Sequence, residues 1–261
     1  MPAQSHQSDP RILRRRTLQT DHRCLATLLR PDIAVLDIGC GSGAITAGIA
    51  EAVGPQGYVI GVDRDAALLE LARKEHATFP HLRFELGDAT NLNFRSQFDI
   101  VTAARTLQWI AEPSLAVANM KKAAKPSGIV LVLDYNHMQN EWEPDPPAEF
   151  KIFYRAFLGW RQANHWDNEI ADHLPELFRS AGLVDIQTHI QDEIVQRGEP
   201  DFPERSAHGP TLSRISVVRL RMRDFAHNRS CEKRRGATNS WLKTVLMRQT
   251  LTMRTVTARV A

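Results

Sequence analysis

Residues 35–50, "VLDIGCGSGAITAGIA", are an apolar run that ends in a cluster of glycines and resumes with helical spacing. The run before the glycines is nearly all apolar, which is typical of a strand that is covered on both faces of a parallel sheet. Glycines leave space beside the backbone, and a strand-to-helix turn with such space commonly accepts a nucleotide-like ligand. The stretch therefore predicts a strand, a ligand-binding turn and a helix, with a tight turn of no further role as the alternative.

Around this unit, predicted strands alternate with predicted helices. The strand "GYVIGVD" (57–63) is followed by "RDAALLELARKEHA" (64–77), whose apolar residues recur at helical spacing. Three further strands are predicted from "LRFELGDAT" (82–90), "FDIVTAAR" (98–105) and "GIVLVLDYN" (128–136), the last entered through a turn. The alternation predicts an α/β fold with a doubly wound, Rossmann-like, mostly parallel sheet, preceded by a helix over 11–29.

The whole chain, 1–261, is expected to form a single domain. The predicted segments are a core of about 30–137 and 174–195 with a last strand at about 250–260, a helical insert at about 142–173, and a basic irregular segment at 206–240. Phe150, Phe153, Phe157 and Trp160 of the insert fall on one predicted helical face. This face is expected either to pack on the core or to act as a lid over an apolar acceptor pocket.

The composition is that of an ordinary globular protein, with 43% hydrophobic and 24% charged residues. No apolar stretch approaches the roughly 20 residues that span a bilayer, and the polar N-terminus does not read as a secretory signal, so we expect a cytoplasmic protein. The formal charge of +3 is too small to indicate a nucleic-acid partner. The three cysteines are far apart and show no paired spacing, which argues against disulfides and against a zinc site, and no metal is expected.

The glycine turn alone does not decide between two classes of ligand. Gly39, Gly41 and Ala44 match G-x-G-x-x-A, and Asp63 lies about 20 residues further on, as in NAD(P)-dependent oxidoreductases. Asp37, however, lies two residues before the first glycine, where it can meet a cationic amino group. A nicotinamide cofactor has no such group, and a nearby carboxylate would repel its pyrophosphate. A second acid, Asp88, lies at the end of the third predicted strand, and Asp37 and Asp88 together disfavour the dinucleotide.

Residues 10–195 resemble the class I S-adenosylmethionine-dependent methyltransferases. The resemblance is closest to the small-molecule branch of the ubiquinone and menaquinone C-methyltransferases, also described as methyltransferase type 11-like. It is carried, in the order of the family, by "VLDIGCGSG", "VIGVDRD", "LGDATNL", "FDIVTAARTLQWI" and "MKKAAKPSGIVLVLD". It implies S-adenosyl-L-methionine as the cofactor and an antiparallel last strand in the sheet.

The resemblance also implies roles for particular residues. Asp37, Gly39, Gly41 and Gly43 are expected to line the methionine end of the cofactor, and Asp63 is expected to accept both ribose hydroxyls. The adenine would meet the Asp88 carboxylate, Ala89 and the guanidinium of Arg64, and Arg105 would lie between cofactor and substrate. Local alternatives are a helix cap for Asp63, a cap or turn for Asp88 and a solvent-exposed side chain for Arg64.

The acceptor is less well defined by the sequence. Methyl transfer is an in-line displacement, so the protein mainly aligns the reactants and excludes water. The fourth strand is not followed by D-P-P-Y or N-P-P-Y, which marks enzymes that methylate base or amide nitrogens. A small aromatic or hydrophobic acceptor is therefore expected, with His137 as the candidate general base and His165 as a second candidate, although either can be an ordinary loop histidine. The methylated atom and the oligomeric state stay open.

The basic segment 206–240 admits other interpretations. Its arginines would suit a nucleic-acid methyltransferase, but it has little aromatic interleaving and no recognisable binding module. Its loss of apolar periodicity is what either a genuine basic loop or a locally shifted reading frame would produce.

A further alternative for the whole chain is a binding module that keeps the cofactor site without turnover.

Overall fold

The computed structural model describes residues 10–208 and 240–261. Its internal contacts divide the chain into two compact units, which are described separately. The sheet unit comprises residues up to 135, 169–191 and 253–261, and the insert unit comprises 136–168 and the described residues of 192–252. The predicted single domain stays a prediction.

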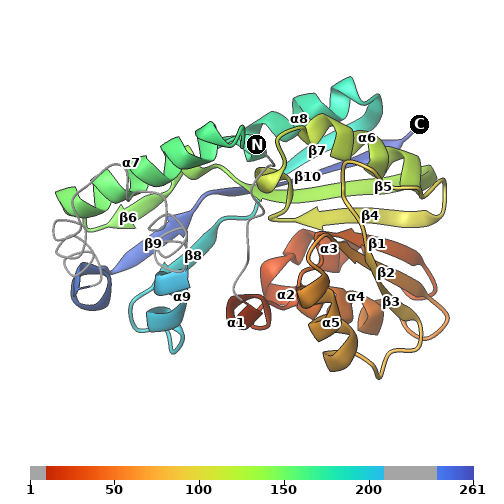
Figure 1. The fold of residues 1–261 in the computed structure, drawn as a ribbon, viewed down its shortest axis with the longest axis horizontal. Helices are drawn as coiled ribbons and strands as arrows, with labels where there is room; N and C mark the ends of the chain where they lie inside the picture. The colour runs from red at the N-terminus through yellow and green to blue at the C-terminus, as the bar shows by residue number, and fades with distance from the viewer. Residues whose placement is uncertain (1–9, 209–239) are drawn as a thin grey trace. The chain divides into compact units, whose positions relative to one another are not determined.

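The sheet unit contains a seven-stranded sheet in the order β3-β2-β1-β4-β5-β10-β7. Neighbouring strands from β3 to β5 are parallel, and β10 runs antiparallel to both β5 and β7 (Figure 1). The predicted doubly wound, mostly parallel sheet with an antiparallel last strand is confirmed. The strands are β1 (Ala34–Ile38), β2 (Tyr58–Asp63), β3 (Leu82–Leu86), β4 (Phe98–Ala104), β5 (Ala124–Tyr135), β7 (Leu183–Ile190) and β10 (Met253–Val260).

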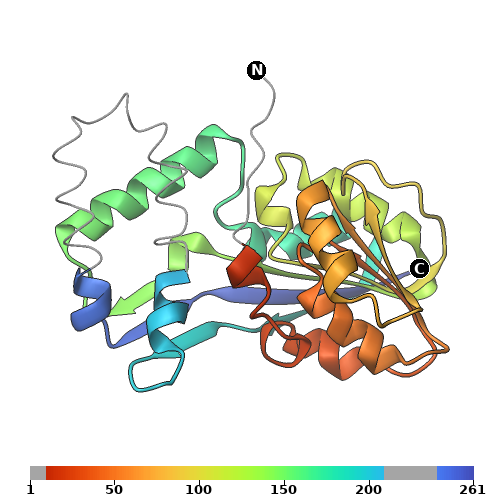
Figure 2. The same ribbon diagram turned by 60° about the horizontal axis from the view of Figure 1, so that its bottom comes forward.

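Helices cover both faces of this sheet (Figures 1 and 2). On one face, α4 (Ala44–Val53) and α5 (Ala66–Glu75) pack their apolar residues on β1 and β2. On the other face, α6 (Pro113–Ala123) and α8 (Ile170–Ser180) pack around β4 and β5. Because β1 and β4 are covered on both faces, their sequences are mostly apolar and do not alternate with polar residues.

The predicted N-terminal helix over 11–29 is wrong in one respect. The structure has three short helices, α1 (Pro10–Leu13), α2 (Leu18–Asp21) and α3 (Arg23–Leu28). Thr17 is extended and caps α2, since its hydroxyl accepts the Thr20 N–H at 3.1 Å while the Asp21 carboxylate accepts the Thr17 N–H at 2.9 Å. Such local side-chain bonds compete with a continuous helix. The break lies between Leu13 and Leu18, and Leu13 packs beside Gly41 of the glycine turn.

β5 also differs from its prediction. It begins directly after α6, at Ala124, so residues that were predicted to form a turn belong to the strand. The shift in register between Phe98 and Ile100 of β4 absorbs this irregular start.

The insert unit contains a three-stranded antiparallel sheet in the order β6 (Glu141–Glu143), β9 (Arg248–Leu251) and β8 (Glu193–Gln196), with α7 (Ala148–Ala163), α9 (Phe202–His208) and the short 3-10 helix η2 (His137–Gln139). The buried residues of α7 are Phe150, Tyr154, Phe157 and Arg161. Phe153 was predicted on the buried face, but Tyr154 is buried in its place. In a helix with 3.6 residues per turn, Tyr154, four residues after Phe150, lies nearer to the direction of Phe150 than Phe153, three residues after it. Residues 170–173 of the predicted insert belong to α8 in the sheet unit.

Most of the basic segment, 209–239, lies outside the described residues, so the interpretations of that segment stay predictions. Among the helices that the structure describes, none has the length and apolar character needed to cross a membrane. Within the same part of the chain, no three His, Cys, Asp or Glu side chains are gathered so that they could hold a metal ion.

Candidate functional site

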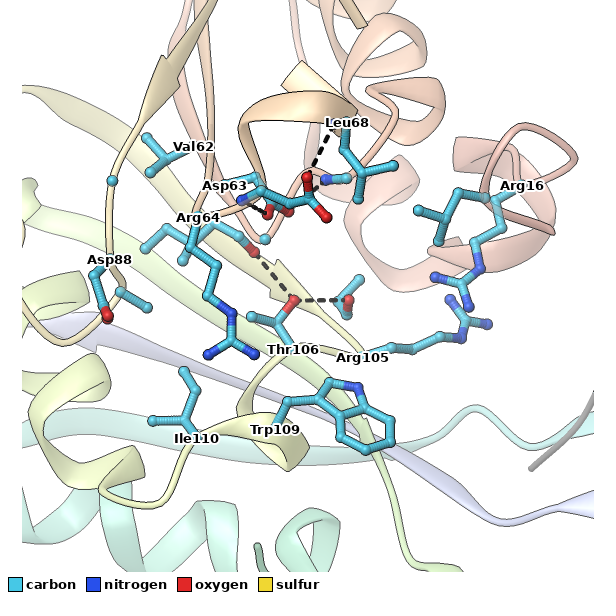
Figure 3. A pocket seen from close by; sticks show the side chains of 18 residues that line it. Arg16, Val62, Asp63, Arg64, Leu68, Asp88, Arg105, Thr106, Trp109 and Ile110 are labelled. Atoms are coloured by element: carbon cyan, nitrogen blue, oxygen red, sulfur yellow. Dashed lines mark hydrogen bonds between the residues drawn. The ribbon is translucent and has the colours of Figure 1, made fainter. Parts of the chain in front are cut away.

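A cavity in the sheet unit lies at the carboxyl ends of β1, β2, β3 and β4 (Figure 3). The strand order reverses here, since β1 pairs with β2 on one side and with β4 on the other, and doubly wound sheets bind ligands at such a point. The lining residues are Leu13, Arg16, Ile38, Gly39, Gly41, Val62, Asp63, Arg64, Asp65, Leu68, Gly87, Asp88, Ala89, Ala104, Arg105, Thr106, Trp109 and Ile110.

Most of the site residues predicted from the sequence meet in this cavity. They are Gly39, Gly41, Asp63, Arg64, Asp88, Ala89 and Arg105. Asp37, Gly43 and His137 are not among the described residues that line it.

Asp63, at the end of β2, is held by backbone donors of two different turns. Its Oδ2 accepts the Gly41 N–H at 2.8 Å, and its Oδ1 accepts the Asp65 N–H at 2.9 Å. A carboxylate has about four lone-pair positions, so these two bonds leave each oxygen able to accept one more donor. The arrangement therefore presents a fixed carboxylate that can accept two ligand hydroxyls.

The alternative role of Asp63 as a helix cap belongs instead to its neighbour. Asp65 is the N-cap of α5, and its Oδ1 accepts the N–H groups of Ala67 at 3.0 Å and Leu68 at 3.3 Å. Because a different acid satisfies the start of α5, capping does not explain the position of Asp63.

Asp88 lies in the loop after β3, at one end of the cavity in Figure 3. Its Oδ1 accepts both the N–H and the hydroxyl of Thr90 at 2.8 Å, which stabilises a local turn. The turn expected as an alternative is thus present, and the carboxyl group that forms it also lines the cavity. Ala89 beside it is buried.

Packing within the protein already requires glycine at positions 39 and 41, independently of any ligand. Gly39 has φ +76°, and a Cβ there would lie 2.1 Å from the Thr106 hydroxyl oxygen. Gly41 has φ +55°, and a Cβ there would lie 2.9 Å from Leu13 Cδ1. Both clashes involve residues that line the cavity, so a side chain at either glycine would disturb the cavity wall.

Gly43 has a different neighbour. It precedes α4 with φ +77°, and a Cβ there would lie 2.6 Å from Phe84 Cζ. Its lack of a side chain is explained by this packing and by the left-handed backbone. Contact with the cofactor through Gly43 stays a prediction.

Asp37 is buried beside the glycine turn. The Thr46 hydroxyl donates to its Oδ2 at 2.7 Å. Burial raises the pKa of Asp37 to about 6, the Thr46 hydrogen bond lowers it, and the charge of Asp63 raises it. Two mutually repelling carboxylates therefore lie near this turn, and a cationic ligand group beside them would relieve their repulsion.

Arg105, at the end of β4, is a buried cation in the left-handed backbone region, with φ +56°. Its Nε donates to the Tyr135 hydroxyl at 2.9 Å, and its Nη1 donates to the Asp21 carbonyl at 3.0 Å. A non-glycine residue in this region is strained, and such strain persists where surrounding contacts fix the side chain.

His137, the candidate base, is a buried residue of the insert unit. Its backbone N–H donates to the Asn168 carbonyl at 2.7 Å, and its carbonyl accepts the Tyr154 hydroxyl at 2.6 Å. Its ring packs edge-to-face on Phe157, with centroids 5.8 Å apart. His165 is exposed, and its N–H donates to the Gln162 carbonyl at 2.9 Å. A catalytic role for either histidine stays a prediction.

Several lining residues were not identified from the sequence. Arg16 and Leu13 come from the N-terminal segment, which carries no motif. Trp109 and Ile110 come from the loop after β4, which includes the short 3-10 helix η1 (Leu107–Trp109). Their position after a parallel strand was a usable signal, because ligands bind at the carboxyl ends of such strands.

Comparison with known proteins identifies the family of the chain. A family model described as a methyltransferase domain matches residues 29–177, which is more than half of the chain. The chain belongs to the methyltransferase domain family. By fold and family it is a class I S-adenosylmethionine-dependent methyltransferase, and it resembles the quinone C-methyltransferases.

Two curated proteins show the extent of the sequence similarity. The demethylmenaquinone methyltransferase of Lactococcus lactis is 31% identical over 173 residues, covering 59% of this chain and 67% of the relative. An uncharacterised 37.1 kDa protein in transposon TN4556 of Streptomyces fradiae is 36% identical over 170 residues, covering 65% of this chain. The methyltransferase chain spans only 40% of the length of that second relative.

Among solved structures, a similar fold occurs in phosphoethanolamine N-methyltransferase 2 of Haemonchus contortus, in complex with phosphomonomethylethanolamine and S-adenosylhomocysteine. The TM-score is 0.56 at 19% identity, and the match covers 91% of this chain and 52% of that one. At this identity the likeness shows the fold of the methyltransferase.

The residues of the cavity fit S-adenosylmethionine. The fixed Asp63 carboxylate suits a ribose diol, the acids at the glycine turn suit a cationic amino-acid end, and Asp88 suits an amino group. A dinucleotide fits less well, because the Asp37 carboxylate beside the glycine turn would repel its pyrophosphate.

Proposed function

We propose that the protein transfers the methyl group of S-adenosylmethionine to a small aromatic or hydrophobic acceptor. The observation that carries this proposal is the Asp63 carboxylate, fixed to the glycine turn through Gly41 and facing the same cavity as Asp88. This arrangement gives one ligand a diol acceptor and an amino acceptor at the ends of neighbouring parallel strands.

We assign the remaining contacts as follows. The Asp88 carboxylate accepts a hydrogen bond from the adenine amino group, and Ala89 and Arg64 lie beside the adenine ring. Asp37 acts through its charge on the amino-acid end, since it is buried behind the turn. Arg105 borders the amino-acid end and the acceptor.

The bound cofactor supplies a methyl group activated by a sulfonium. The protein's part is to hold both reactants in line and to exclude water, for which Leu13, Trp109 and Ile110 provide apolar walls. His137 would be needed as a base only for an acceptor that is still protonated. The buried position of His137 supports a packing role at least as well as a role as base. Activity of the His137→Gln variant, measured across pH, decides between these two roles.

The acceptor class is supported by the apolar walls and by similarity to a demethylmenaquinone methyltransferase. Purified protein incubated with methyl-labelled S-adenosylmethionine and a cell extract should label a small, organic-extractable product. Label found only in tRNA would contradict the proposed acceptor.

The cofactor is tested by calorimetry with S-adenosylhomocysteine and NADH. We expect S-adenosylhomocysteine to bind and NADH to bind weakly or not at all. Tight NADH binding without a response to S-adenosylhomocysteine would favour the oxidoreductase instead.

Substitution of Asp63 tests the ribose contact. Asp63→Ala removes two charge-assisted hydrogen bonds, each worth about 1.5–3 kcal/mol, so affinity for S-adenosylhomocysteine should fall by about 100-fold or more. The matched control is Glu70→Ala, which removes an exposed carboxylate from α5 outside the cavity and should leave affinity unchanged. Equal affinity of Asp63→Ala and wild type would contradict the assignment.

A further inference from the structure

The seven-stranded sheet ends in an exposed edge at β7. Among the described residues, β7 has β10 as its strand neighbour on one side and no strand on the other (Figure 1). Every residue from Gln187 to Ile190 is exposed, and Ile190, at 75%, is the most exposed large hydrophobic residue that the structure describes. Such an edge presents unpaired backbone N–H and C=O groups, to which another strand can bond.

The two edges of the sheet differ in charge. β3, at the opposite edge, exposes Arg83 and Glu85, and charged side chains on an edge disfavour pairing with a further strand. Residues 186–190 of β7, "IQTHI", include no Asp, Glu, Lys or Arg, and isoleucine and threonine favour strand structure. β7 is therefore the edge without this protection.

The backbone groups that face outward from β7 follow from its pairing with β10. Antiparallel neighbours alternate between residue pairs that exchange hydrogen bonds and pairs that do not. Ile190 lies opposite Arg254, and the N–H of the next residue, Gln191, donates to the Met253 carbonyl at 3.1 Å. The odd-numbered residues of this stretch therefore bond to β10, and the N–H and C=O groups of Thr188 and Ile190 point away from it.

The regular part of this edge is short and has a definite centre. Asp185 has φ +54°, and the pairing with β10 shifts its register beside that residue. Beyond the other end of β7, Gln191 is buried. The regular, exposed edge thus comprises residues 186–190, and Thr188 is its middle residue.

This edge is complementary to itself about a two-fold axis through Thr188. In that antiparallel arrangement, Thr188 of one copy lies opposite Thr188 of the other, and their outward backbone groups exchange hydrogen bonds. Ile190 lies opposite Ile186 of the second copy, which covers the exposed Ile190 side chain. Gln187 lies opposite His189, so two side chains that form hydrogen bonds become neighbours.

We propose that a second copy of this chain pairs with β7 along residues 186–190, antiparallel and about a two-fold axis at Thr188, to form a dimer. An axis one residue earlier would include the irregular Asp185, and an axis one residue later would include the buried Gln191. A two-fold contact is closed, so association stops at two copies. The dimer joins two seven-stranded sheets into one continuous sheet.

The size and place of this contact set its strength and its effect. A pairing of five residues buries less than the roughly 1,200 Å² of a standard interface, so the dimer is expected to be weak and reversible. In the strand order β5 and β10 separate β7 from β4, and no residue of β7 lines the cavity. The pairing is therefore independent of the proposed function.

Charges placed on the axis test the pairing. Sedimentation velocity of the full chain, over a hundredfold range of concentration, compares wild type, Thr188→Lys, Thr188→Glu and an equimolar mixture of the two variants. Wild type should dimerise at the high concentrations. Each variant alone should associate about 5-fold more weakly or worse, because like charges then face each other across the axis. The mixture should associate at least as strongly as wild type, because lysine then faces glutamate.

Leu86→Lys is the matched control, since it places a lysine on an exposed apolar residue of the other edge strand, β3. It should dimerise as wild type does. Circular dichroism and S-adenosylhomocysteine binding check that the Thr188 variants are folded. If wild type does not bind S-adenosylhomocysteine, the proposed function fails, and sedimentation still decides the dimer.

The proposal is overturned if wild type stays monomeric over the whole range, or if neither charged variant weakens association. Failure of the mixture to recover also overturns it, because Thr188 then does not face its own counterpart. Species larger than a dimer, or an equal loss in Leu86→Lys, contradict a closed contact at β7.

Discussion

Asp37 and Asp63 lie near the same glycine turn in very different surroundings. Asp63 accepts two backbone N–H groups and lines the cavity, whereas Asp37 is buried and accepts one hydroxyl. Hydrogen bonds to a carboxylate favour its charged form, and burial disfavours it. Burial raises the pKa of Asp37 to about 6, so the charge of Asp37 changes near neutral pH.

The stability of the protein should depend on Asp37 in a defined pH window. Its folded pKa of about 6 lies above the unfolded value of 3.8, so its contribution is fully present below pH 3.8 and is lost as the pH rises through 6. The shift corresponds to about 3 kcal/mol. Asp37→Asn should therefore gain up to about 3 kcal/mol of unfolding free energy relative to wild type at pH 8, with the gain vanishing near pH 4.

Urea denaturation at pH 4, 6 and 8 measures this effect, with Glu51→Gln on the exposed face of α4 as the control. A gain for Asp37→Asn that is equal at all three pH values would show that Asp37 does not titrate in this window. As a second readout, S-adenosylhomocysteine binding at pH 6 should release protons from wild type and fewer from Asp37→Asn, as measured by calorimetry in two buffers.

At the level of secondary structure, the junction of α2 and α3 depends on a buried histidine. His22 is fully buried, and its Nε2 lies 2.8 Å from the Thr102 hydroxyl of β4. The pKa of His22 is lowered to about 3, chiefly by burial and also by the nearby Arg105, whereas Asp21 acts to raise it. The side chain is therefore neutral in the folded protein, and it fixes the N-terminal helices to the sheet.

This depressed pKa predicts acid sensitivity of the opposite sign to that of Asp37. Because the folded pKa of His22 lies below the unfolded value of 6.5, its contribution is present above pH 6.5 and is lost as the pH falls toward 3. Between pH 6.5 and 4.5 the loss is about 2 kcal/mol. In His22→Gln, urea denaturation should show a flatter dependence of stability on pH in this range, and the same slope as wild type would refute the assignment.

Elements with a continuous apolar pattern were predicted nearly to their ends. The helix predicted after the glycine turn is present as α4 (Ala44–Val53), and the predicted bounds of the strands around it differ from the observed ones by a few residues at most. The break at Thr17 was missed, because capping by a hydroxyl and a nearby carboxylate leaves the apolar periodicity intact. The strength of the apolar pattern thus sets which boundaries a sequence can reveal.

At the scale of the whole molecule, the predictable part of the site is the part encoded in contiguous motifs. Asp63 and Asp88 could be placed because Asp63 ends β2 and Asp88 lies two residues after β3. Arg16 could not, since its position depends on the tertiary contact that fixes α2 through Asp21 and Arg105. The division into two compact units also arises from contacts between distant segments, which no local pattern reports.

Ligand binding to the sheet unit should stabilise the protein by mass action. S-adenosylhomocysteine at 100 times its dissociation constant should raise the unfolding free energy by about 2.7 kcal/mol, which thermal or urea denaturation can measure. NADH at the same concentration should leave the midpoint unchanged. A shift with NADH but none with S-adenosylhomocysteine would contradict the family's cofactor for this chain.

The close approach of Gly39 to Thr106 bears on how glycine motifs are interpreted in other sequences. A methyl group at position 39 would collide with the protein's own hydroxyl before any ligand arrives, and the backbone there already excludes most side chains. A descendant that lost its methyl donor would still need this glycine in order to fold. Glycine spacing alone therefore indicates the shape of a turn. Evidence that the site still binds a cofactor must come from the acidic residues around the turn.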